Sequence, residues 1–223
     1  MPGMDAMALT MPEEILLLLL DDETGKPVGL PGPAGDLAVM GAILMELALA
    51  GRIDTDLDSL TVVDPRPIGD PVLDGVLARL AEPGAARTSR GWIQDFAKGA
   101  GLLRTQLLER LVQAGVLRRV EDGFLWVFPE RRYPKAEARV EVEEVRARLR
   151  HVLLDDSIPE PRDALLIGLA RAASLVPVLV SPDEAVRAAP RVERIAALEE
   201  LSRSLGAATR DIYAALMRQG AIH

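Results

Sequence analysis

The most concentrated apolar run in the chain is Ile15–Leu20, six aliphatic residues with a pair of acidic residues on either side. Six helical residues rise only about 9 Å, whereas a bilayer core requires about 20 apolar residues. A short helix that is apolar on every side belongs inside a protein. The pattern therefore predicts a buried core helix, which begins at the capping box formed by Thr10 and Glu13.

Apolar residues at helical spacing predict further helices along most of the chain. Asp36 and Asp70 have side chains suited to N-caps, and Gly51 and Gly115 lie where helices would end. The predicted helices cover residues 36–50, 70–81, 101–114, 136–154, 162–175, 183–189, 192–205 and 209–219, with a short one that begins at Ser89 and contains Trp92 and Phe96.

Two short hairpins interrupt the helical pattern. Residues 52–53 and 60–63 lie on either side of an acidic turn and predict one pair of strands. Residues 116–120 and 124–128 flank a Glu-Asp-Gly turn and predict the second. The predicted fold class is therefore mainly α: a compact helical bundle domain with small β-hairpins, formed as a single domain over residues 1–223.

Composition narrows the nature of the core and the setting of the protein. Hydrophobic residues make up 49% of the chain but aromatic residues only 3%, which favours packed helices over a β-sandwich. The absence of cysteine excludes disulfides and favours a cytoplasmic location, where any membrane contact would be peripheral, at the inner face. The residues before the leucine run lack the features of a signal peptide. A net charge of −8 argues against nucleic-acid binding by bulk charge.

No residue pattern supports catalysis or a cofactor. Residues 54–58 have the spacing that begins a calcium loop, but Ser59 and Pro65 stand where glycine and a bidentate glutamate are required. His151 and His223 have no cysteine or second histidine nearby to complete a metal or nucleophile set. Nucleophile-elbow, phosphate-loop and dinucleotide motifs are also absent. We therefore expect a non-enzymatic protein without a metal or cofactor.

The segment 101–128 is the supersecondary unit that most suggests a function. An amphipathic helix, a glycine turn and a two-stranded wing are similar to the end of a winged helix. The helix has two basic residues, Arg104 and Arg110, with Glu109 beside the second. One hypothesis is therefore a regulatory or interaction protein that binds DNA or a protein partner. Internal ion pairs at both arginines would exclude the hypothesis that this helix binds DNA.

The densest basic cluster follows the second predicted hairpin and consists of Arg131, Arg132, Tyr133 and Lys135. A basic patch beside apolar and aromatic residues suits an anionic membrane surface, where each charge contributes about 1 kcal/mol. These four residues are the predicted membrane contact. The alternative is a solvated loop, because acidic residues flank the cluster on both sides.

Segments in matching order and spacing over nearly the whole chain resemble the Golgi phosphoprotein 3 family. They are residues 10–18, 41–53, 68–74, 92–93, 109–117 and 162–166. The arginine- and alanine-rich composition looks like the bacterial branch of that family. The resemblance implies a mainly helical fold around a buried helix bundle. It also implies a peripheral membrane protein that binds phosphatidylinositol 4-phosphate and, in eukaryotes, sorts Golgi glycosyltransferases.

The resemblance also implies where a lipid head group would bind. The family pocket uses a tryptophan before the second helix, an arginine at the start of that helix, and an Arg-x-x-Arg on the helix before the hairpin. These positions fall on Pro31, on Met40, and on Gly101 and Arg104 of this chain. Only Arg104 keeps the basic side chain, and each lost phosphate contact costs about 1.5–3 kcal/mol, so binding at this predicted site should be weak.

Backbone amides around Gly99–Gly101 add to the predicted site, because a helix N-terminus attracts anions. The leading hypothesis is thus a non-catalytic protein, with a possible adaptor role, that contacts anionic lipid near Arg104 and residues 131–135. The alternatives are the winged-helix-like regulatory protein and a helical scaffold whose ligand binding has decayed.

Overall fold

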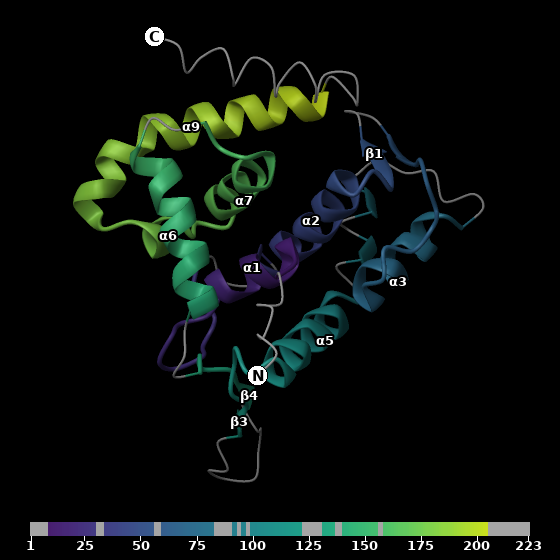
Figure 1. The fold of residues 1–223 in the computed structure, drawn as a ribbon, viewed down its shortest axis with the longest axis horizontal. Helices are drawn as coiled ribbons and strands as arrows, with labels where there is room; N and C mark the ends of the chain where they lie inside the picture. Colours follow the sequence, from purple (N-terminus) through teal and green to yellow (C-terminus); the bar gives the residue numbers. More distant parts are fainter. Residues whose placement is uncertain are drawn as a thin grey trace, which may run out of the picture.

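The computed structural model is mainly helical in the residues that it describes (Figure 1). These residues are 9–29, 34–55, 59–82, 91–92, 95–96, 99–121, 131–136, 140–155 and 158–204. The helices are α1 (Met11–Leu18), α2 (Ala34–Leu49), α3 (Pro71–Leu80), α5 (Ala100–Gln113), α6 (Val140–Leu154), α7 (Pro161–Ala172), α8 (Val176–Leu179) and α9 (Pro182–Ser204). The strands are β1 (Ile53–Thr55), β2 (Leu60–Val62), β3 (Val120–Glu121) and β4 (Arg131–Arg132), in two antiparallel pairs. The predicted fold class, mainly helical with small hairpins, is confirmed.

Helix α1 lies in the middle of the described residues, and helices α2, α5, α6 and α7 pack against it (Figure 1). The side chains of Ile15–Leu18 are at most 1% exposed, which confirms the core helix predicted from the leucine run. Each fully buried aliphatic side chain stabilises the fold by about 1.5–3 kcal/mol, so α1 holds its four neighbours together. None of the described helices is both long and apolar enough to cross a bilayer.

Several helix ends lie where their residues predict them. The Asp70 carboxylate accepts hydrogen bonds from two amides of the first turn of α3, at 2.9 and 3.0 Å. Gly115 follows α5 with a φ of 77°, the left-handed conformation that ends many helices. Helix α2 begins at Ala34, so Asp36 lies inside its first turn and not at the predicted N-cap. The helix dipole favours a carboxylate at either position.

Helix α9 continues through Pro190, where the sequence predicted two separate helices. Proline removes one helical hydrogen bond, which is the reason for the predicted break. Ala188, Val192 and Ile195 are buried on one face of α9 on both sides of the proline. This face packs against α6 and α7, and the packing keeps the helix continuous. The predicted helix over 209–219 lies outside the described residues.

The two hairpins differ in how well their pairing was predicted. Strands β1 and β2 pair as expected, with Ile53 opposite Val62. In the second hairpin Val120 pairs with Arg132, and Leu117 forms a bridge with Lys135 in the same register. The predicted pairing of 116–120 with 124–128 is therefore wrong. The basic cluster itself is the returning strand, and residues 124–128 lie outside the described part of the chain.

A close backbone contact between two loops accompanies this register. Gly25 has a φ of 65°, and a Cβ atom added to it would lie 2.3 Å from the backbone nitrogen of Pro134. Only glycine allows the loop after α1 to approach the returning strand so closely. The turn motif in the sequence favours a tight hairpin locally, but packing against the loop after α1 determines the observed pairing.

Candidate functional site

Helices α2 and α5 bring the predicted head-group residues together only in part. Arg104 lies near the start of α5 with 43% of its side chain exposed, and its Nη1 lies 3.2 Å from Oδ1 of Asp36 on α2. Gly101 is exposed in the first turn of α5, with open space where a side chain would be. Met40 is completely buried one turn after Asp36, which removes it from the predicted site. Pro31 lies outside the described residues.

Asp36 changes the charge of this site. Its carboxylate lies in the first turn of α2, where the helix dipole stabilises a negative charge. The Oδ1 atom is closed to solvent and makes no hydrogen bond of good geometry beyond its ion pair with Arg104. The pair is electrically neutral, whereas the sequence indicated a single arginine without an opposing charge.

Residues Gly99–Arg104 form the α5 N-terminal surface. Gly99 has no side chain with which to cap the helix, and the Leu102 amide donates to the Gly99 carbonyl at 3.0 Å, so the capacity to bind an anion rests on the amide of exposed Gly101. Leu102 is 75% exposed on this surface, next to exposed Gly101. An exposed apolar side chain, a helix N-terminus and one paired arginine therefore lie within two helical turns.

Because of the register of β4, only part of the basic cluster that was predicted to contact a membrane lies at the surface. Tyr133 and Lys135 are buried, and the Lys135 amine donates to the Leu20 carbonyl at 3.3 Å and pairs with the Asp22 carboxylate. Strand pairing directs these two side chains into the protein, so they are removed from the predicted contact.

Arg131 and Arg132 form β4 itself, and Arg132 is partly buried. Their contact with a membrane stays a prediction. Only half of the cluster therefore remains a candidate for binding an anionic surface.

Asp22 joins Lys135 to Arg146 beside a cavity of about 280 Å³. Arg146 donates from Nη2 to Asp22 at 2.9 Å. Burial lowers the pKa of Lys135. Burial also opposes ionisation of Asp22, but hydrogen bonds from Arg146 and Lys135 hold its pKa below the ordinary value. The cavity is lined by Leu20, Asp21, Asp22, Glu23, Val28, Arg146 and Val178, and its carboxylates make it unsuited to an anionic head group.

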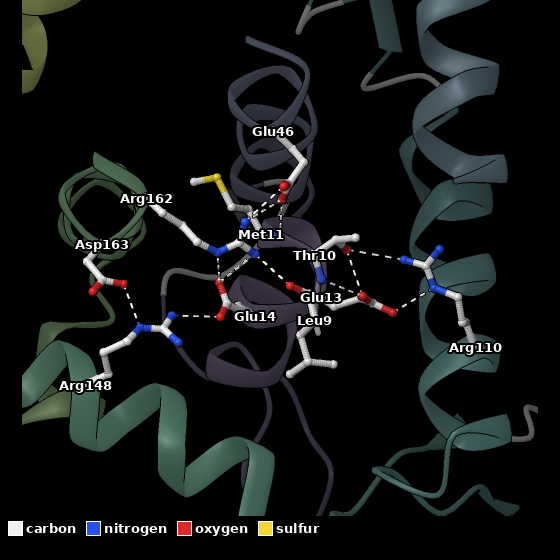
Figure 2. Close-up of polar contacts among 10 residues, drawn as sticks. All are labelled: Leu9, Thr10, Met11, Glu13, Glu14, Glu46, Arg110, Arg148, Arg162 and Asp163. Carbon is white, nitrogen blue, oxygen red and sulfur yellow. Dashed lines mark hydrogen bonds and ion pairs between the residues drawn. The ribbon is translucent and has the colours of Figure 1, made fainter. Parts of the chain in front are cut away.

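A second group of charges, the α1 ion-pair network, surrounds the start of α1 (Figure 2). The three arginines of the network come from α5, α6 and α7, and two of its carboxylates are on α1. The members are Glu13, Glu14, Glu46, Asp70, Asp163, Arg110, Arg148 and Arg162. The carboxylates thus outnumber the arginines within the network.

Each arginine of the network joins two carboxylates from different elements, and Figure 2 shows all of these carboxylates except Asp70. Arg148 donates to Glu14 and to Asp163, both at 2.7 Å. Arg162 lies 3.0 Å from Glu14 and 2.9 Å from Glu46 on α2. Arg110 links Glu13, at 2.7 Å, to the N-cap of α3. The network therefore connects α1 to five other helices through side chains.

Burial dominates the electrostatics at Glu14. It raises the pKa of the Glu14 carboxyl, although hydrogen bonds and charges of Arg148 and Arg162 act in the opposite direction. The sequence identified Glu13 only as part of a capping box, and the Glu13 carboxylate does accept from the Thr10 amide at 2.8 Å. The remaining signal in the sequence was acidic residues next to an entirely apolar helix, because buried carboxylates require partners.

Comparison with models of protein families identifies the relatives of this chain. The model of the Golgi phosphoprotein 3 (GPP34) family matches residues 11–216, which include α1, α5 and the whole ion-pair network. The chain belongs to the Golgi phosphoprotein 3 family. A search of curated proteins finds no significant match. Membership of the family is consistent with a non-enzymatic role in binding lipid or protein.

In this member of the Golgi phosphoprotein 3 family, both basic residues of α5 form internal ion pairs. Its two basic residues are Arg104, which pairs with Asp36, and Arg110, which pairs with Glu13 and Asp70. Both arginines therefore have the internal ion pairs that count against DNA binding in the winged-helix hypothesis. Binding of DNA or of a protein partner stays a prediction.

The histidines and the acidic turn add no site in the described part of the chain. Nδ1 of His151 lies 2.5 Å from the Asp155 carboxylate, and both side chains are exposed on α6 and just after it. His223 and residues 56–58 lie outside the described residues. No group of three or more metal-binding side chains is found among the residues that the structure places.

Proposed function

We propose that this protein is a non-catalytic binding protein that attaches weakly and reversibly to an anionic membrane surface through the α5 N-terminal surface. The observation that supports this most is Leu102, which is 75% exposed beside Arg104 at an uncapped helix start. A lone aliphatic side chain is common on a protein surface. Here it adjoins the groups that would receive a phosphate, which is the combination that a lipid surface requires.

The magnitudes indicate which group contributes most. Moving Leu102 into the acyl boundary contributes about 1.5–3 kcal/mol. One basic residue near anionic lipid contributes about 1 kcal/mol. The sum of about 2.5–4 kcal/mol corresponds to a dissociation constant of about 1–15 mM, so binding is weak and depends more on the leucine than on the arginine. A second signal, such as a protein partner or residues 131–132, would be needed for stable attachment.

Co-sedimentation with vesicles tests this proposal. The full chain is mixed at low salt with vesicles of phosphatidylcholine alone and with vesicles that also contain phosphatidylglycerol. Leu102→Asp should lower recovery with the anionic vesicles by about tenfold, since it removes the apolar contact and adds a negative charge. Val186→Asp is the matched control, because Val186 is an equally exposed aliphatic residue on α9.

Two outcomes count against the proposal. One is equal recovery of the unmodified protein with neutral and anionic vesicles. The other is an equal loss for both variants, which would show that added charge, and not the α5 N-terminal surface, governs attachment.

A further inference from the structure

We draw no further inference here: the strongest candidate, the cavity of about 280 Å³ where the loop after α1 meets α6 and α8, carries none because its charged lining is a carboxylate cluster whose Asp22 already pairs with Lys135 and Arg146, and nothing else among the described residues points to a ligand there.

Discussion

A single carboxylate, Asp22, makes it possible to bury a lysine in this fold. Lys135 has no exposed side-chain surface, and its amine contacts Asp22 and the Leu20 carbonyl. Asp22 also receives two hydrogen bonds from Arg146. Asp22 pairs with two cations, and each of these cations depends mainly on Asp22. Removing the Asp22 carboxylate should therefore lower the stability of the fold more than removing the Lys135 amine.

Asp22→Ala should therefore destabilise the protein more than Lys135→Met. Removing the carboxylate leaves an unpaired buried ammonium group, at a cost of about 3 kcal/mol or more. Replacing Lys135 by methionine leaves Asp22 paired with Arg146 and should cost about 1–2 kcal/mol. Urea unfolding followed by circular dichroism measures both values. An equal or larger loss for Lys135→Met would contradict this interpretation of the pair.

Among the described helices, α1 combines a buried aliphatic stretch with charged side chains at its start. Its last residues are aliphatic and buried, and its first turn carries the buried carboxylates of Glu13 and Glu14. Arginines from α5, α6 and α7 neutralise these carboxylates from three sides (Figure 2). The position of α1 is thus set by apolar packing along the helix and by ion pairs at its start.

Arg162→Met should destabilise the protein by about 3–5 kcal/mol, because it leaves Glu14 and Glu46 with fewer donors in a network that already has an excess of carboxylates. Glu14→Gln should cost about 1 kcal/mol or less at neutral pH, since Arg148 and Arg162 keep their other partners. Guanidinium unfolding of the two variants provides the comparison.

The pH dependence of Glu14→Gln checks the same network. The folded-state pKa of Glu14 is raised above its ordinary value of 4.5, so its contribution to stability is full below that value and is lost as pH rises through the folded pKa. The free energy of unfolding of the unmodified protein should therefore rise relative to that of Glu14→Gln as the pH falls to about 4. A difference that grows with rising pH instead would show that ionised Glu14 is net stabilising.

These elements also show how far sequence reasoning reaches. The core helix and the cap at Asp70 were predictable because each depends on residues within a few positions of one another. The pairing of Val120 with Arg132 was not, since packing against the loop at Gly25 overrides the local turn motif.

The residues of the candidate site likewise fall into those that local sequence patterns identify and those that depend on tertiary packing. Arg104 was found from the sequence, but Asp36, its opposing group, was treated only as a helix cap. Their contact depends on the packing of α2 against α5, which no local pattern reports. Lys135 was placed on the surface for its charge, although the strand register buries it.

At the scale of the whole molecule, the described helices are arranged around α1. Helices α2, α5, α6 and α7 lie between residues 34 and 172 of the chain, and all contact α1 (Figure 1). The β1–β2 pair lies at the end of α2, and Val63 just after it is strongly exposed. The centre and the margin of the fold should therefore differ in local stability.

Native-state hydrogen exchange should find the slowest amides in Ile15–Leu18, with exchange only through global unfolding. The amides of β1 and β2 should exchange faster, through local opening of a two-stranded pair. Mass spectrometry of peptides from the two regions, at several low concentrations of denaturant, makes the comparison. Equal rates in both regions would rule out α1 as the last element to open.

The α1 ion-pair network joins positions that are far apart in the chain: Arg110 and Glu13 are 97 positions apart, Arg148 and Glu14 are 134, and Arg162 and Glu14 are 148. In a chain without cysteine, these pairs act as reversible cross-links. Contacts of such long range form late in folding, because long loops must close before they can be made. Interactions that are absent from the transition state slow unfolding and leave the folding rate unchanged. We therefore expect loss of the network to speed unfolding more than it slows folding.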